Sequence, residues 1–519
     1  METYYLTTAI DYANAPPHIG HAYEKIAADI VARYNRLAGR DVFFLTGTDE
    51  HGAKIEQAAT DAGQSPQEFV DAVVQRFKLA WEKLLISHDR FIRTTDEDHV
   101  AVVQEIFRRM RDKGDVYKGT YKGLYCEGCE DYKRERDLDD QGNCPLHKRK
   151  PKEMHEENYF FRLTAYKEPL RKWLSTEGNV LPDGRRREVL NQLEDEDFGD
   201  FSVSRPRASL AWGIPVPDDD EHVIYVWIDA LTNYITGVGF QHDDALWNKY
   251  WPANLHLIGK DIVKFHCIYW PAMLMAANVE LPKLVFGHGF ITVEGQKMSK
   301  TLGNVLDPVA MVDEWNADGN GADRIRYYLF AANTFDQDGD FSRKDFYATV
   351  NSHLANGLGN LLNRALTLID KNCEGKVPAG AVDPGALKIA VDAQAAFVKE
   401  MEAFEFAKAL EAIKSITDEA NRYINDQKPW SMFKEGKNAE GAAVLLTSAE
   451  LVKRAAVLLA PFTPGLSQKV WDQLGFEGDI CRVKLTDSVM VSPIPTGQAV
   501  RNQGPVFLRL EDAAPAGKA

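Results

Sequence analysis

The hydrophobic pattern at the start of the chain predicts a strand, a loop, a helix and a second strand. Residues 4–10 are β-branched and aromatic, residues 22–37 carry apolar side chains at helical spacing, and residues 41–46 form another short apolar run. This order is typical of a parallel α/β unit, in which ligands bind beyond the carboxyl ends of the strands. Segments 18–21 and 48–51 each fall at such an end.

The pattern changes further along the chain. From about residue 116 to 222 the apolar runs are short, charges are dense, and Pro and Gly recur, which indicates an insertion. Buried-strand patterns return at 223–228, 255–258 and 283–286, with a helical run at 261–277, so we expect the α/β sheet to resume there.

Beyond about residue 346 the periodicity is helical, which predicts a bundle. The predicted helical runs are 354–369, 389–423, 439–459 and 465–474.

Composition narrows the class of protein. A chain of 519 residues that is 45% hydrophobic can bury large cores, which excludes a disordered or fibrous protein. Its 61 Lys and Arg against 77 Asp and Glu leave a net charge of −16, so any RNA contact must be a local patch. No apolar run approaches the roughly 18 to 20 residues of a spanning helix, and the N-terminus lacks a signal-peptide pattern. We therefore expect a soluble, cytoplasmic protein with no membrane partner.

Three of the six cysteines crowd one short stretch. Cys126 and Cys129 are followed, after fourteen residues, by Cys144 and His147 in a second pair with the same two-residue spacing. Three thiolates and one imidazole in this pattern predict a closed tetrahedral site for one structural Zn²⁺ per chain.

Two other segments are candidates for phosphate binding. One segment, with His18, Gly20 and His21, lies between the predicted strand and the predicted helix. Two imidazoles and a glycine backbone therefore lie at the positive end of the helix dipole. Lys297 and Lys300 lie three residues apart on a loop with glycines on both sides, which could close over phosphates. Each signal is weak alone, but both in one α/β chain indicate nucleotide chemistry.

These two segments resemble the signatures of the class I aminoacyl-tRNA synthetases, His-Ile-Gly-His and Lys-Met-Ser-Lys-Ser. The second has Thr301 in place of the usual serine and keeps the hydroxyl. The resemblance implies that an amino acid is activated with ATP and Mg²⁺ and then passed to tRNA. The catalytic residues it implies are His18, His21, Lys297 and Lys300. The ATP-binding residues it implies are His18, Gly20, His21, Gly259, Asp261 and Lys300.

Segments 8–14, 225–230 and 259–262 resemble the methionyl members of this class. The resemblance implies L-methionine as substrate, with Asp49 holding its α-ammonium group. The methionine-binding residues it implies are Ile10, Tyr12, Trp227, Ala230, Tyr234, Ile262, His266 and Trp270. Aromatic walls suit a polarizable thioether, and Tyr12 and His266 can offer hydrogen bonds to sulfur. One departure from the family pattern is Leu231, where a proline is sometimes found.

The helical region carries candidates for reading RNA. Asn360 and Arg364 lie four residues apart on one predicted helical face, and Trp430 follows Pro429 at a helix end. Such groups can read base edges of unpaired RNA and stack on a base. By the same resemblance, these three residues recognise the anticodon of tRNA(Met).

The expected fold is a Rossmann-type parallel-sheet catalytic core with a zinc-knuckle insertion, followed by an all-α helical bundle that binds the anticodon. The expected segments are 1–115 and 223–290 for the two halves of the catalytic domain, 116–222 for the insertion, 291–345 for the Lys-Met-Ser-Lys loop and linking region, 346–510 for the bundle and 511–519 for a disordered tail. The resemblance implies methionyl-tRNA synthetase activity on initiator and elongator tRNA(Met). Without an appended dimerisation domain we expect a monomer.

Two alternatives stay open at this point. Another class I synthetase or a smaller-molecule nucleotidyltransferase would share residues 18–21 but need no bundle, and the amino-acid dependence of pyrophosphate exchange separates these. A catalytically silent RNA-binding paralogue would keep the zinc knuckle and the bundle, and absence of ATP turnover would favour it.

Overall fold

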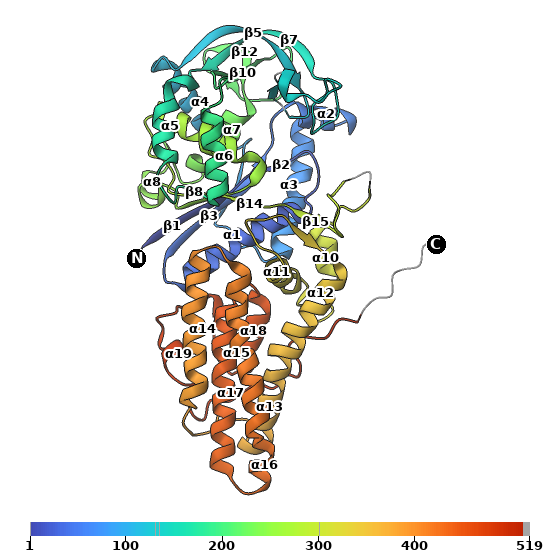
Figure 1. Ribbon diagram of the computed structural model, residues 1–519, viewed down its shortest axis with the longest axis vertical. Coiled ribbons are helices and arrows are strands. Elements are labelled where there is room, and N and C mark those ends of the chain that lie inside the picture. Colours follow the sequence, from blue (N-terminus) through green and yellow to red (C-terminus); the bar gives the residue numbers. More distant parts are fainter. Residues whose placement is uncertain (1, 130, 134, 300–301, 512–519) are drawn as a thin grey trace, which may run out of the picture.

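The computed structural model describes residues 2–129, 131–133, 135–299 and 302–511. An α/β part forms one end of the molecule and a bundle of long helices forms the other (Figure 1). Lys300 and Thr301 lie outside the described residues. So does the tail expected at 511–519, apart from Glu511.

The centre of the α/β part is a parallel sheet of seven strands among the described residues. Its strands are β1 (Thr3–Thr8), β2 (Asp11–Tyr12), β3 (Asp41–Asp49), β4 (Arg90–Arg93), β8 (Val180–Leu181), β13 (Leu255–Gly259) and β14 (Val285–His288). β1 pairs with β3 on one side and with β13 on the other, so Leu6 lies beside both Phe44 and Leu255. β4 extends the sheet beyond β3, while β14 and then β8 extend it beyond β13. The strand order therefore reverses at β1, and in open α/β sheets ligands bind at the carboxyl side of such a switch point.

Helices cover both faces of this sheet. Two hydrophobic cores result, one shared by α1 (Ile19–Leu37), α3 (Pro66–Lys83) and the bundle, the other by α4 (Glu97–Asp112), α7 (Val226–Thr236) and α9 (Trp270–Ala276). The predicted strand and helix at the N-terminus and the strands at 255–258 and 283–286 are confirmed to within a few residues. The predicted helix at 261–277 is confirmed, but with a π-helical turn at Phe265–Tyr269.

The segment expected as an insertion is built on a long antiparallel hairpin. β5 (Val116–Cys126) and β7 (Lys152–Phe161) arch over the sheet, with β6 (Asp131–Lys133) and β9 (Phe201–Ser202) at their edges (Figure 1). One strand from within this segment, β8, nevertheless joins the core sheet beside β14.

The strand predicted at 223–228 is wrong in part. β12 (Asp219–Ile224) ends earlier and belongs to a separate antiparallel sheet with β10 (Ser204–Pro206) and β11 (Pro215–Val216), and α7 begins at Val226. A continuous apolar run fits a buried helix as well as a strand, and here its second half is helical.

The bundle is confirmed, but its helices are divided differently. The main helices are α10 (Pro308–Glu314), α11 (Gly321–Ala331), α12 (Arg343–Thr349), α13 (Asn360–Cys373), α14 (Pro384–Glu402), α15 (Phe406–Gln427), α16 (Pro429–Lys434), α17 (Asn438–Leu459) and α18 (Pro464–Gln473). The run predicted at 389–423 is two helices that reverse at Phe404, whose φ is 59°. The run predicted at 354–369 begins inside a π-helical segment, Val350–Gly359.

A buried ion pair joins the two parts of the molecule. Arg326 on α11 is fully buried and lies 2.7 Å from a carboxylate oxygen of Asp29 on α1. Its guanidinium also donates to the carbonyls of Leu84, Pro461 and Phe462 at 2.8 to 3.1 Å. The bundle is thus anchored directly to the helix that follows β1.

Among the described residues, no helix is both long and apolar enough to cross a membrane.

Candidate functional site

The first candidate group lies at the carboxyl end of β1, where α1 begins. His18 caps α1: its Nδ1 accepts from the Gly20 backbone at 3.1 Å, while Nδ1 of His21 accepts from the His18 backbone at 3.1 Å. The two rings stack with centroids 3.8 Å apart. Because both Nδ1 atoms accept, each neutral imidazole carries its proton on Nε2 and can donate to an anion there. Burial, together with the electrostatic influence of the nearby His18 and Lys25, lowers the pKa of His21 well below its ordinary value.

Gly20 must be a glycine for this arrangement. A Cβ at this position would lie 2.9 Å from the His18 ring and 3.3 Å from the methyl group of Met298. The second contact brings the loop at 295–304 against the start of α1, and Ile19 N donates to the carbonyl of Leu306 at 3.0 Å. Lys297 is exposed on this loop, whereas Lys300 lies outside the described residues. The two predicted phosphate-binding segments are therefore brought together as far as the structure describes them.

The aromatic residues predicted around methionine form a linked wall. Nδ1 of His266 lies 2.9 Å from the Ile262 carbonyl, which can only accept, so this nitrogen carries the proton. Nε2 then accepts from the Tyr234 hydroxyl at 2.6 Å. Burial lowers the pKa of His266 to about 4, so the ring is neutral at physiological pH. Both nitrogens of His266 are thus engaged within the protein, and the hydrogen bond to sulfur that the sequence suggested stays a prediction.

Trp270 and Trp227 both contact this wall and differ in burial. Trp270 is fully buried, packs on Tyr234 and donates its indole N–H to Nε2 of His256 at 3.2 Å. Trp227 is only partly buried and stacks on Phe265 with ring centroids 3.6 Å apart. Ala230 lies between Trp227 and Tyr234 on α7. Trp270 therefore supports the wall from behind, while Trp227 can meet a ligand directly.

The remaining predicted methionine contacts lie at the ends of neighbouring strands. Ile10 and Tyr12 are partly buried, in and just before β2, and Tyr12 lies in register with Asp49, the last residue of β3. Asp49 is buried, and its carbonyl accepts from Ala13 N at 2.9 Å. The carboxylate thus sits where β2 and β3 end, beside the start of α1.

Gly259 and Asp261 lie at the carboxyl end of β13, the strand on the other side of β1 from β3. Gly259 ends β13, and Asp261 follows in a short 3-10 turn, exposed beyond the strand end. A Cβ on Gly259 would lie 2.9 Å from an oxygen of Asp261. The predicted ATP-binding residues on β13 and α1 therefore lie at the same, carboxyl edge of the sheet.

Several buried residues near the carboxyl end of β3 escaped the sequence analysis. Asp229 on α7 accepts from His51 at 2.7 Å and from His99 at 2.8 Å, which links the end of β3 to the helix that carries Trp227 and Tyr234. Burial alone would raise the pKa of Asp229, but the charges and hydrogen bonds of these two histidines hold it below its usual value. Arg93 forms a two-pronged ion pair with Glu50 at 2.8 Å. The partners lie 43 to 178 residues apart, so no local spacing signals them.

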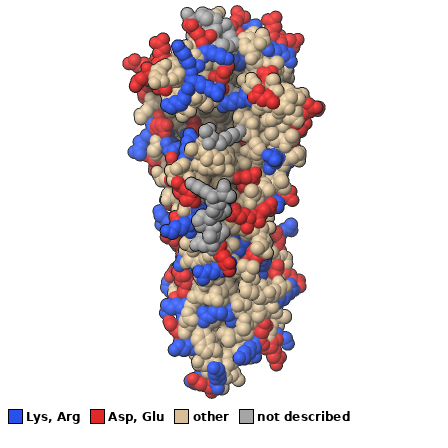
Figure 2. Space-filling model, turned by 90° about the vertical axis from the view of Figure 1, so that its right-hand side faces the viewer, with Lys and Arg blue, Asp and Glu red and all other residues tan. Residues whose placement is uncertain are grey.

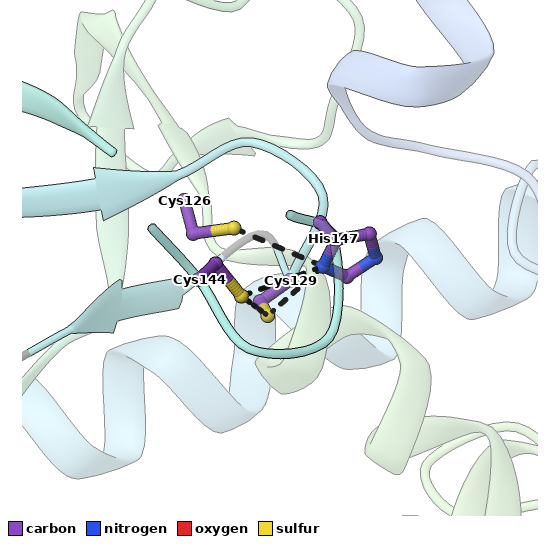
Figure 3. A group of neighbouring side chains, drawn as sticks. All are labelled: Cys126, Cys129, Cys144 and His147. Carbon is purple, nitrogen blue, oxygen red and sulfur yellow. Dashed lines mark hydrogen bonds between the residues drawn. The ribbon is translucent and has the colours of Figure 1, made fainter. Parts of the chain in front are cut away.

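The four predicted metal ligands come together at the tip of the β5–β7 hairpin (Figure 3). Cys129 lies 3.6 Å from Cys144 and 3.4 Å from Nδ1 of His147, and the contacts of Cys126 and Cys144 with His147 are 3.9 and 3.7 Å. A tetrahedral ion bound at about 2.3 Å needs donors about 3.8 Å apart, so this set can hold one metal ion. Gly128 is required beside it, since a Cβ there would lie 2.4 Å from the His147 ring.

The predicted RNA-reading residues gather near the end of the bundle farthest from the sheet (Figure 1). Arg364 donates to the side-chain oxygen of Asn425 at 2.8 Å, and its guanidinium lies 5.7 Å from the Trp430 ring centroid. Asn360 is exposed one turn earlier on α13. Elsewhere on the surface drawn in Figure 2, both charge signs alternate over the bundle, while Lys and Arg gather at the opposite end above a hollow.

Two family models match nearly the whole chain. The model described as tRNA synthetases class I (M) matches residues 4–154 and 140–366. The model described as the anticodon binding domain of methionyl tRNA ligase matches residues 383–517.

Individual relatives agree with these matches. The methionine–tRNA ligase of Thermotoga maritima is 44% identical over 98% of this chain and 80% of its own length. A structure of Mycobacterium tuberculosis methionyl-tRNA synthetase in complex with methionyl-adenylate is 40% identical, with a TM-score of 0.92 over 98% of this chain and 100% of that one. The free-state structure from the same organism has a TM-score of 0.85 at 37% identity, over 99% of each chain.

The buried His266 predicts a specific loss of stability in acid. The pKa of His266 is about 4 in the folded protein and near 6.5 in the unfolded chain, so between these values the unfolded chain binds a proton that the folded chain does not. The free energy of unfolding should therefore fall as the pH is lowered from 6.5 to 4. In His266→Gln that fall should be smaller by about 3 kcal/mol. Urea unfolding at several pH values measures it, with His242→Gln at an exposed site as control; equal pH slopes for both variants would contradict the assignment.

Proposed function

The chain belongs to the methionyl-tRNA synthetases of class I, and from that premise we propose that it activates L-methionine with ATP and transfers the methionyl group to tRNA(Met), both initiator and elongator. The methionine carboxylate attacks the α-phosphate of ATP, pyrophosphate leaves, and the resulting methionyl-adenylate passes its acyl group to the 3′ end of the tRNA. The observation that carries the proposal is the close approach of the start of α1 to Met298 on the loop at 295–304, at the carboxyl edge of a sheet whose central strand is bonded to the aromatic wall through Tyr5 and Tyr234.

Residues at the start of α1 would stabilise the charge that develops on the phosphates. The Nε2–H groups of His18 and His21 are donors whose orientation is already fixed by the bonds to Nδ1, so little reorganisation is needed as the transition state forms. Lys297 and Lys300 would add positive charge from the loop that contacts Gly20 through Met298. Mg²⁺, bound with ATP, would neutralise the leaving pyrophosphate. Gly259 and Asp261 would hold the nucleotide from β13.

The methionine side chain would lie against the aromatic wall. Trp227, Tyr234 and His266 offer ring surface to a polarizable thioether, and no charged group of the wall competes because His266 is neutral. Ile10, Tyr12, Ala230 and Ile262 would complete the pocket, with Trp270 behind it. Asp49 would hold the α-ammonium group at the strand ends, which places the substrate carboxylate toward the start of α1.

We further assign the four ligands of the hairpin tip to Zn²⁺. Three thiolates and an imidazole are the donors that zinc prefers, and four protein ligands leave no position for catalysis, so the ion would be structural. Asn360, Arg364 and Trp430 would recognise the anticodon at the other end of the molecule, with Trp430 as a stacking surface.

Amino-acid-dependent ATP–pyrophosphate exchange tests the proposal without any tRNA. The full chain should catalyse exchange with methionine and with no other amino acid among the twenty at equal concentration. Exchange with a different amino acid would keep the class and overturn the pocket. Absence of exchange with all twenty would overturn the function and favour a silent RNA-binding paralogue.

Replacing Trp430 should affect tRNA and not amino-acid activation. Trp430→Ala should raise the apparent KM for tRNA(Met) about 5- to 150-fold, because stacking on a base contributes about 1 to 3 kcal/mol. Exchange with free methionine should stay at the wild-type rate. Phe433→Ala on the same helix, where the ring packs on Gly441, is the matched control; equal tRNA KM values for both variants would remove Trp430 from the RNA contact.

Metal content tests the hairpin tip. The purified protein should contain about one zinc per chain, and Cys126→Ser should lose it because three donors no longer close the tetrahedron. Cys373→Ser, at a cysteine on α13, should retain the ion. Elemental analysis that finds full zinc in Cys126→Ser would reject the four-ligand assignment.

A further inference from the structure

Four ionisable side chains are buried in a row beneath the start of α1. Lys25 is fully buried, and Asp11, Glu24 and His288 are 4 to 7% exposed. Nζ of Lys25 donates to the Ala9 carbonyl at 2.8 Å, to Asp11 at 2.9 Å and to Glu24 at 2.8 Å. Glu24 in turn bonds to Nε2 of His288 at 3.0 Å. Three oxygen acceptors thus use all three protons of one buried ammonium group.

The network continues from Glu24 into β14. Nδ1 of His288 lies 2.7 Å from the Gly289 carbonyl, and Nε2 lies 3.0 Å from the Glu24 carboxylate. Burial raises the pKa of Asp11 to about 7, although the positive charge of Lys25 opposes that rise. Removing one partner of such a buried group is strongly destabilising, because it leaves the other charge uncompensated.

The partners of Lys25 belong to two of the segments that the proposed reaction uses, and the network reaches a third through His288. Ala9 and Asp11 flank Ile10 and precede Tyr12, the residues proposed to touch methionine. Glu24 and Lys25 lie one turn after His21 on α1. His288 ends β14 in register with Gly259, and the charges of Glu24 and His288 also act on the Asp261 carboxylate. One ammonium group therefore connects the loop that carries Ile10 and Tyr12 with helix α1. Through Glu24 and His288 it is also connected to β14.

We propose that Lys25 is a positioning residue for adenylate formation, which fixes the loop carrying Ile10 and Tyr12 relative to the start of α1. The reaction requires the methionine carboxylate to approach the α-phosphate in line, and a displacement of about 1 Å can cost about a hundredfold in rate. Lys25 sets this distance through its bonds to Ala9 and Asp11, while its own backbone belongs to the helix whose first turn faces the phosphates. The inference rests on the proposed function.

A charge-neutral double variant tests it. Asp11→Asn with Lys25→Met removes the ammonium and one carboxylate together, and leaves the Glu24–His288 pair in place. The kcat of methionine-dependent exchange should fall about 10- to 100-fold, with each substrate KM within about threefold of wild type, because transition-state geometry rather than ground-state binding is lost.

The bundle offers a matched control. Lys453 on α17 is also fully buried and donates to Glu450 at 2.8 Å and to the Ser492 carbonyl at 2.9 Å. Glu450→Gln with Lys453→Met should lower the thermal midpoint in a similar way while exchange keeps its kcat. Both variants are assayed at a temperature where both are folded.

The outcomes separate this inference from the proposed function. A kcat for the double variant within about tenfold of the control's would overturn the positioning role and leave Lys25 a purely stabilising residue. If the double variant does not fold, Asp11→Asn alone decides: it keeps Lys25, a kcat lowered about threefold or more supports the inference, and an unchanged kcat overturns it. A wild-type protein without methionine-dependent exchange would overturn the proposed function and this inference with it.

Discussion

Helix α1 is enclosed by protein along almost its whole length, and this enclosure is the constraint on which the rest of the structure depends. It packs on the sheet on one side and on the bundle on the other, yet it carries Glu24, Lys25 and Asp29 at buried positions. A buried charge is tolerated only when it is paired and hydrogen-bonded. Each of these residues therefore needs a partner at a fixed place on a neighbouring element.

The partners of these buried residues come from different parts of the chain. Burial of α1 therefore fixes the positions of those parts relative to the helix. Asp29 pairs with Arg326, which also binds carbonyls at the α17–α18 junction. The bundle is therefore held in one position against the α/β part. Lys25 and Glu24 bind the loop after β1 and the end of β14. These contacts hold α1 in one position. The backbone at its start then fixes the orientation of the two imidazoles and of their Nε2–H groups.

The sequence was most informative where chemistry is local and least informative where partners are distant. Short spacings in the sequence identify both the segment from His18 to His21 and the four metal ligands. The structure brings the residues of each set together. The helix break at Phe404 carries no Gly or Pro, so periodicity ran through it. The apolar run after His222 is half strand and half helix, because burial on all sides removes the period that tells them apart. Lys25 was not singled out in the sequence, and only the structure reveals its bonds to Ala9, Asp11 and Glu24, the last of which bonds to His288, 264 residues away from it.

The aromatic wall shows how such distant contacts prepare a site before a ligand arrives. The proton on Nδ1 of His266 is fixed by the Ile262 carbonyl, which makes Nε2 the acceptor for Tyr234, while the carbonyl of Tyr234 accepts from Tyr5 on β1 at 2.6 Å. These hydrogen bonds all lie in the interior. They connect the central strand to the aromatic wall and fix the orientation of the wall's side chains. The backbone as a whole matches the adenylate complex of the mycobacterial synthetase at a TM-score of 0.92 and its free state at 0.85. A wall held in this way has little conformational entropy left to lose when a ligand binds, and binding energy can then serve the alignment of reacting atoms.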